Sequence, residues 1–297
     1  MSGINEWMRN ESHALADELA ALNSEQIIGK GISGFGMKGK VIELIDELKA
    51  ALFPSLYERS FSGNGHLDIE VSSRLNNVAM MLNDMIKYVL SHKCKREHNE
   101  NCTECTDNAE RITLDFMNSL SDIRKLLATD IEAAYLGDPA AIYMDEILLS
   151  YPSIEAVTVY RLAHKLFELK VPLIPRIMTE HAHQLTGIDI HPGATIGDHF
   201  FIDHGTGVVI GETCVIGSHV KLYQGVTLGA KSFELDEYGN PIKGVKRHPN
   251  IEDNVVIYSG ATILGGNTTV GSGSIIGGNV WLVESVPPNS KVYNKLS

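Results

Sequence analysis

The last third of the chain repeats an aliphatic side chain at every sixth residue. The residues in phase are Ile190, Ile196 and Ile202, then Ile210, Ile216, Leu222 and Leu228, then Ile251, Ile257 and Ile263, and finally Val270, Ile276 and Leu282. A period of six matches neither the period of an amphipathic helix nor the simple alternation of an exposed strand. It is typical of a parallel β-helix, in which each short strand sends one aliphatic side chain inward before the chain turns a corner.

Two interruptions of this repeat are expected to carry the chemistry. The phase slips by two residues at 203–207, where the sequence reads Asp-His-Gly-Thr-Gly, and a long polar loop over 230–248 breaks the repeat again. Residues at a slip are displaced from the wall of the coil, and the long loops of a repeat scaffold usually carry its functional groups. We therefore expect a site near His204 and this loop.

The first part of the chain is predicted to be helical. Eighteen of the 27 glycines follow residue 181, whereas the residues before it contain apolar stripes with helical spacing. These stripes are Val41, Leu44, Ile45, Leu48 and Leu52, then Leu75, Val78, Leu82, Met85 and Val89, then Ile112, Phe116, Leu120, Ile123 and Leu127, and last Val157, Tyr160 and His164. We predict an α+β protein with an α-helical domain over 1–181, a polar cysteine-containing insert near 92–108, and a β-helix domain over 182–297.

Composition excludes several classes of partner. The formal net charge is -12, whereas binding to nucleic acid through its phosphates needs a clustered basic face. No apolar run reaches the ~18 residues that a membrane span needs, and the acidic residues near Met1 do not fit a signal peptide. The four cysteines are too few for a disulfide framework. We expect a cytoplasmic protein with no nucleic-acid or membrane partner.

Six polar residues are expected near one edge of the β-helix, because its coils should stack about every eighteen residues. They are Asp189, Asp203, His204, Glu212, Arg247 and His248. A carboxylate that orients an imidazole makes a general base for a hydroxyl group, and Asp189 is placed to orient His204. The Arg247 fork suits a substrate carboxylate, and Asp138 or Asp203 suits an ammonium group. The set predicts a site for a small zwitterion, and the alternative is a set of solvated corner residues.

Several motifs, in this order, resemble those of the serine acetyltransferase family. They are Asp138-Pro139-Ala140, Tyr160-Arg161-Leu162-Ala163-His164, Asp189-Ile190-His191-Pro192, the run from Asp203 to Thr213, Gly225-Val226-Thr227-Leu228-Gly229, and Arg247-His248-Pro249. The resemblance implies a left-handed parallel β-helix that forms a homotrimer, with the helical domains as oligomerisation units that pair two trimers. The site then lies between neighbouring subunits.

The resemblance also implies a reaction and roles for residues. Acetyl-CoA, as co-substrate, would give its acetyl group to the hydroxyl of L-serine, the first step of cysteine synthesis, with no catalytic metal. His204 is implied as the base with Asp189 as its orienting partner. Asp138 and Asp203 are implied to bind the substrate ammonium, and Arg247 and His248, with Glu212 beside them, its carboxylate.

The binding of coenzyme A is implied for a further set of residues. Backbone groups at Gly229, Ala230, Gly260 and Ala261 are implied to hold the pantetheine arm. Lys246 belongs to a basic group in the loop, with Lys231, Lys243 and Arg247, that offers a counter-charge to the phosphates of coenzyme A.

Other functions stay open on the sequence alone. One is acetyl transfer to another small hydroxyl acceptor, such as homoserine or a sugar. A second is a zinc enzyme like the γ-type carbonic anhydrases, with ligands drawn from His191, His199, His204, His219 and His248. A third is a binding or scaffold protein without catalysis.

Two further predictions concern cysteines and the C-terminus. Cys94, Cys102 and Cys105, with His92 or His98, are a candidate structural zinc site, and the alternative is a polar loop with free thiols. In the resembled family, a flexible tail ending in isoleucine enters the active site of O-acetylserine sulfhydrylase. This chain ends at Ser297, which offers almost no apolar area, so we expect no tail-mediated complex with that partner.

Overall fold

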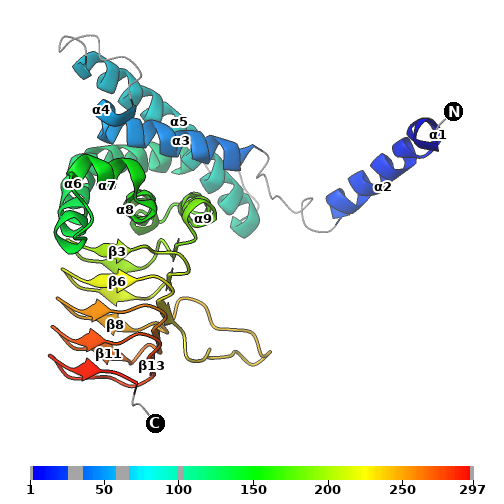
Figure 1. The fold of residues 1–297 in the computed structure, drawn as a ribbon. Coiled ribbons are helices and arrows are strands. Elements are labelled where there is room, and N and C mark those ends of the chain that lie inside the picture. Colours follow the sequence, from blue (N-terminus) through cyan, green and yellow to red (C-terminus); the bar gives the residue numbers. More distant parts are fainter. Residues whose placement is uncertain (1–2, 26–35, 58–66, 99–103, 295–297) are drawn as a thin grey trace.

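The computed structural model describes residues 3–25, 36–57, 67–98 and 104–294. Figure 1 shows two stacked parts, a group of packed helices and, below it, a column of short strands. The helices are α1 (Gly3–Asn10), α2 (Ser12–Glu25), α3 (Met37–Leu52), α4 (Pro54–Tyr57), α5 (Leu67–His98), α6 (Glu104–Gly137), α7 (Met144–Ser150), α8 (Pro152–Glu168) and α9 (Ile174–Thr186). The order of helices followed by strands confirms the predicted α+β class.

The helical core is built from the predicted apolar stripes. Val41, Leu44, Ile45 and Leu48 of α3 are fully buried in one core with Val78 of α5, and α3 packs against α5. The α6 stripe is buried as well, so each long helix contributes one apolar face to a shared core.

The column of strands consists of three parallel sheets. Sheet A has the order β1 (Asp189–Ile190), β4 (Val209–Ile210), β7 (Thr227–Gly229), β10 (Thr262–Leu264) and β13 (Trp281–Leu282). Sheet B contains β2 (Thr195–Ile196), β5 (Val215–Ile216), β8 (Asn250–Ile251) and β11 (Thr269–Val270). Sheet C contains β3 (Phe201–Asp203), β6 (Lys221–Tyr223), β9 (Val256–Ile257), β12 (Ile275–Ile276) and β14 (Lys291–Val292). The chain visits A, B and C in turn, as a parallel β-helix does.

The six-residue repeat sets the register between coils. In sheet A, Ile190 pairs with Ile210, which pairs with Leu228, so aliphatic side chains stack along the column interior. Every repeat residue is buried except Leu282, which is half-buried in the last coil. We call the turns from C to A, from A to B and from B to C the CA, AB and BC corners. The two-residue slip lies at the CA corner, and the loop 230–248 leaves from the AB corner.

A buried ion pair joins the helical part to the first coil. The Arg161 guanidinium on α8 lies 3.0 Å from the Asp130 carboxylate on α6, and it also donates to the carbonyls of Ile196 and Gly197. Asp130 in turn accepts from the backbone N–H of Phe200. The two residues are almost fully buried, so they fix where α6 and α8 sit on the β-helix.

The transition between the two parts lies further along the chain than residue 181. Helix α9 runs through this position to Thr186, and Gly187 ends it with a φ of 70°, which glycine adopts without strain. Strand β1 begins two residues later, at Asp189. The limits of the two domains as independent units remain a prediction.

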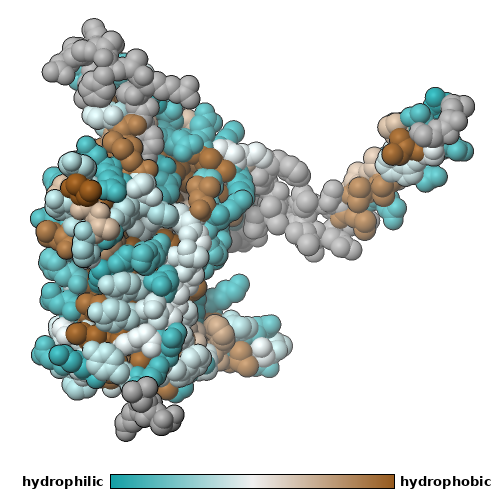
Figure 2. All heavy atoms as spheres, in the orientation of Figure 1, coloured by the Kyte–Doolittle hydropathy of each residue, from teal (hydrophilic) through white to brown (hydrophobic). Residues whose placement is uncertain are grey.

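Helices α1 and α2 form an arm that Figure 1 draws away from the packed helices. Figure 2 shows hydrophobic side chains along this arm, and Trp7, Leu15, Leu19 and Leu22 are among its exposed residues. Within the described ranges, none of the helices combines the length and the apolar composition that a bilayer crossing requires.

Candidate active site

Four charged or titratable side chains lie close together at the CA corner, those of Asp138, Asp203, His204 and Lys221. Asp203 ends β3, and its carboxylate lies 3.0 Å from the Lys221 ammonium on β6 and 3.8 Å from the His204 imidazole. Lys221 also donates to the carbonyl of Gly137, the last residue of α6, at 2.8 Å. Asp138 follows directly, and its charge acts on both Lys221 and His204. The end of α6 therefore brings Asp138 to the first coils of the β-helix.

Asp138 is held as a carboxylate. Its Oδ2 accepts from the Tyr151 hydroxyl at 2.5 Å, and its Oδ1 accepts from the N–H of Ala140 at 2.8 Å. The Tyr151 hydrogen bond, helped by that of Ala140, lowers the pKa of Asp138, and the same bond raises the pKa of Tyr151 to about 12. Asp138 and Asp203 therefore offer two carboxylates at one corner, as a cationic substrate group requires.

His204 is the most accessible of these side chains. Its side chain is 71% exposed, and its backbone has a φ of 61° within the slip, where Gly205 and Gly207 also have positive φ. Asp189 begins β1 at the CA end of sheet A. Among the described residues, no hydrogen bond or ion pair joins Asp189 to His204, and the nearest carboxylate to the imidazole is that of Asp203. The role of Asp189 as orienting partner stays a proposal.

The AB corner holds a second group, built around Thr213. The Thr213 hydroxyl oxygen accepts from the N–H groups of Arg247 and His248, at 2.9 and 3.1 Å, where loop 230–248 returns to the coil. The Arg247 guanidinium pairs with the Glu212 carboxylate at 2.5 Å. Burial raises the pKa of Glu212, but the hydrogen bond and charge of Arg247 outweigh it, so the net pKa is lowered. Thr213 thus fixes the Arg247 backbone, and Glu212 its side chain.

His248 is held as a neutral imidazole. Its Nδ1 accepts from the Thr213 N–H at 3.0 Å and lies 2.9 Å from the Thr213 hydroxyl. Burial, with the positive charge of Arg247, lowers its pKa to about 4. With Nδ1 accepting, the proton of the ring lies on Nε2. The packing needs glycine at Gly211, because a Cβ there would overlap the His248 ring.

The residues implied for coenzyme A divide between the same two corners. Gly260 and Ala261 lie at the CA corner, where Gly207, Gly225 and Gly260 have positive φ and stack closely on one another. Gly229 and Ala230 lie where β7 leaves for the AB corner. The Lys246 ammonium donates to the Thr213 carbonyl and to Asn250 Oδ1.

A cavity lies at the base of the loop. It has a volume of about 310 Å³, and its lining includes Lys231, Lys246 and Arg247 together with Gly265 and Gly266. Glu234 also lines the cavity, so three cationic side chains and one carboxylate leave an excess of positive charge that suits an anionic group such as a phosphate.

The prediction that all six polar residues lie near one edge of a single chain is wrong. Asp203 and His204 lie at the CA corner, whereas Glu212, Arg247 and His248 lie at the AB corner. Strand β4 of sheet A runs between them, and at ~3.3 Å per residue the four steps from Gly207 to Gly211 span about 13 Å. Glu212 follows Asp203 and His204 by nine and eight residues, and strand β4 lies in between. It therefore lies at the next corner and not at the same one.

The candidate zinc ligands are also separated. His204 lies at the CA corner, His191 and His248 at the AB corner, and His199 and His219 at the BC corner. Of the cysteine group, Cys94 lies on α5, whereas Cys102 and the side chain of Cys105 lie outside the described residues. The structural zinc site near 92–108 therefore stays a prediction.

The sequence analysis gave no role to three residues of these groups, Tyr151, Lys221 and Thr213. Tyr151 precedes a helix and shows no spacing relation to Asp138, so nothing marks it in the sequence. Lys221 precedes the repeat residue Leu222, and Thr213 lies midway between the repeat residues Ile210 and Ile216, so neither position indicates a role. The strand register does not reveal the ion pair either, because Lys221 pairs with Phe201 and Asp203 pairs with Tyr223.

Curated proteins similar to this chain include several serine acetyltransferases. A curated relative, the plasmid serine acetyltransferase of Synechococcus elongatus, is 48% identical over 285 residues, which cover 94% of this chain and 83% of the relative. The chain belongs to the serine acetyltransferase family. The serine acetyltransferase of Bacillus subtilis is 45% identical over 168 residues, 57% of this chain and 73% of its own. No model of a protein family matches the chain.

Solved serine acetyltransferase structures share the fold. Serine acetyltransferase 1 of Entamoeba histolytica, in complex with L-cysteine, superposes with a TM-score of 0.73 at 38% identity and covers 84% of this chain and 86% of its own. The Neisseria gonorrhoeae enzyme in complex with serine superposes with a TM-score of 0.55 at 28% identity, over 85% of this chain and 94% of its own. The family resemblance predicted from the motifs is confirmed.

Proposed function

We propose that this chain catalyses serine O-acetylation, the transfer of the acetyl group of acetyl-CoA to the hydroxyl of L-serine, and so supplies the first step of cysteine synthesis. The observation that carries the proposal is the similarity to the Synechococcus relative over 94% of the chain, which includes both corners of the site. The serine bound in the Neisseria structure supports the choice of substrate.

The charges at the two corners match the two ends of a serine zwitterion. Asp138 and Asp203 offer carboxylates to the ammonium group at the CA corner, beside His204. Arg247 and the Nε2–H of neutral His248 offer donors to the carboxylate at the AB corner. A sugar acceptor has neither an ammonium group for the CA corner nor a carboxylate for the AB corner, so the geometry favours an amino acid.

The reaction then needs one proton transfer to start. His204 takes the proton of the serine hydroxyl as the oxygen attacks the thioester carbonyl carbon, and a tetrahedral intermediate forms. The carbon–sulfur bond breaks next, the thiolate of coenzyme A leaves, and the proton passes from the imidazole to that sulfur. A positioned general base contributes ~10² to 10⁴ in rate, which a weakly nucleophilic hydroxyl needs near neutral pH. Cys214 takes no part, because burial raises its pKa to about 12.

A second copy of the chain completes the site. The two corners of one chain lie about 13 Å apart along sheet A, farther than one serine reaches. In a cyclic trimer, the CA corner of one subunit faces the AB corner of the next around a threefold axis, and three equal sites form. The same interface would bring the CA-corner glycines and the basic cavity of the loop to one acetyl-CoA. We propose this homotrimer, with a dimer of trimers as a further assembly, as the active state.

A comparison of acceptors tests the proposed function. Release of the coenzyme A thiol is measured with purified protein, acetyl-CoA and either L-serine, L-homoserine or glucose. We expect turnover with serine at a kcat/KM at least tenfold above that with homoserine, because the extra methylene moves the hydroxyl away from His204. A higher kcat/KM with homoserine or glucose would assign the chain a different acceptor.

A further inference from the structure

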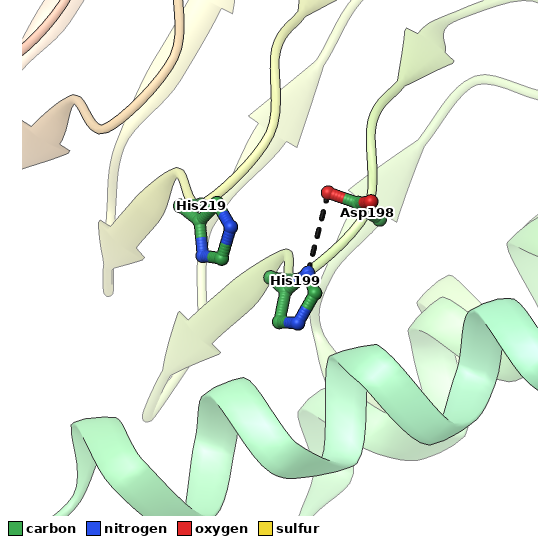
Figure 3. A group of neighbouring side chains, drawn as sticks. All are labelled: Asp198, His199 and His219. Carbon is green, nitrogen blue, oxygen red and sulfur yellow. Dashed lines mark ion pairs between the residues drawn. The ribbon is translucent and has the colours of Figure 1, made fainter.

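The BC corner, away from both parts of the proposed active site, carries a cluster of metal-binding side chains. Asp198 and His199 lie between β2 and β3, and His219 lies at the equivalent place one coil below, between β5 and β6. Figure 3 shows the two imidazole rings one above the other, with Asp198 beside His199. The ring centroids are 4.1 Å apart with an interplanar angle of 21°. One donor atom from each of the three residues lies within 4.8 Å of the others.

Two of these donor atoms are buried without a hydrogen-bond partner. They are Asp198 Oδ1 and His199 Nδ1, which face each other at 3.3 Å. Buried polar atoms without a partner are rare and costly in native proteins. A cation placed between two such acceptors satisfies both.

A second carboxylate lies on the other side of the His199 ring. Glu132 on α6 approaches His199 Nε2 at 3.8 Å, opposite the Nδ1 that faces Asp198. A metal ion bound at Nδ1 replaces any proton on that nitrogen, and the remaining ring proton on Nε2 then faces Glu132. A carboxylate on the far nitrogen is the usual support of a metal-binding histidine.

The backbone of the cluster is already fixed. His199 and His219 have φ values of 51° and 57°, and the N–H of His219 donates to the Asp198 carbonyl at 3.0 Å. The N–H of His199 donates to the Thr129 hydroxyl on α6 at 3.1 Å. The first two coils and α6 therefore hold the three side chains at one place, so little ordering remains for a ligand to impose.

We propose that Asp198, His199 and His219 bind one divalent transition-metal ion, such as Zn²⁺, which cross-links the first two coils of the β-helix beneath α6. Tetrahedral zinc with bonds of about 2.0 to 2.1 Å places its donor atoms about 3.3 Å apart. Asp198 and His199 already have this separation. The His219 donor atom lies within 4.8 Å of the other two, and its exposed side chain has to rotate to complete the site. Water fills the fourth position.

The chain itself supplies a substitution for the test. Asn254 occupies the same corner position in the next coil with a φ of 59°, so asparagine fits this backbone. The variants are His199→Asn, His219→Asn and the double variant, with His183→Asn on α9 as a control histidine outside the cluster. Each protein is freed of metal with a chelator, its fold is checked by circular dichroism, and it is titrated with Co²⁺ and then Zn²⁺.

We expect the wild-type protein and His183→Asn to bind one Co²⁺ per chain at this site. Each single variant should bind this ion at least tenfold more weakly, and the double variant should not bind it. The cobalt spectrum of this ion should show visible d–d bands without thiolate charge transfer, which separates it from the cysteines near 92–108. Zn²⁺ should also raise the melting temperature of the wild type but not of the double variant. Equal Co²⁺ binding by wild type and double variant, or no binding by wild type, would overturn the proposal.

Discussion

The His204 imidazole is the side chain on which turnover depends most in the proposed reaction. We predict that His204→Asn lowers kcat by about 10² or more, because a general base is lost. Asparagine tolerates the φ of 61° at this position, and the side chain is exposed, so the melting temperature should stay unchanged. Thiol release at saturating serine measures the effect, with His183→Asn as the control. Near-normal kcat in His204→Asn would remove the residue from the mechanism.

His248 should make stability depend on pH in a defined window. Its pKa is about 4 in the folded chain and ~6.5 in an unfolded one, so the unfolded state binds more protons between these values. The free energy of unfolding is therefore highest above about pH 6.5, and it falls by roughly 2 to 3 kcal/mol as the pH falls toward 4.

We predict that His248→Asn flattens this loss, since the amide keeps an acceptor for Thr213 but does not titrate. Urea unfolding at several pH values between 4 and 7 measures the free energy of unfolding for both proteins. An equal pH dependence in wild type and variant would contradict the assigned cause.

The contact between the helices and the β-helix depends on Arg161 and Asp130. Replacing Arg161 by methionine leaves a buried carboxylate and two carbonyls without their donor. We predict a loss of about 3 to 5 kcal/mol in the free energy of unfolding, because breaking one side of a buried ion pair leaves an uncompensated charge. Arg176→Met, which removes an exposed pair with Glu180 on α9, should cost less than about 1 kcal/mol. Similar losses for the two variants in denaturant unfolding would refute this account.

The sequence predicted those elements whose side chains repeat with the period of their structure. The six-residue repeat predicted the β-helix because each repeat residue points from one sheet into the interior of the column. Ile190, for example, pairs with Ile210, which pairs with Leu228. The helical stripes predicted α3, α5, α6 and α8 for the same reason. Helix α9 was not predicted as a separate element, because the boundary was placed where glycines become frequent and not at the left-handed turn of Gly187.

At the scale of the whole molecule, charge and residue type predicted a zwitterion site, but spacing alone did not predict where its parts lie. Asp138 reaches the CA corner only because α6 packs against β3, a contact between segments far apart in the sequence. Arg247 lies at the AB corner because Thr213 binds the returning end of the loop. Neither contact is marked by a repeat in the sequence, so the positions of the two parts of the site could be seen only in the three-dimensional structure.

Complementation between subunits tests the central claim that each site combines the CA corner of one subunit with the AB corner of the next. His204→Asn and Arg247→Gln chains, each nearly inactive at low serine, are coexpressed with different tags, and trimers that carry both tags are purified. We predict that these mixed trimers regain about one third of the wild-type activity, because one of three interfaces pairs an intact CA corner with an intact AB corner. Trimers that carry both tags on the same variant are the control and should stay inactive. Mixed trimers no more active than the two parent variants would contradict a site shared between subunits.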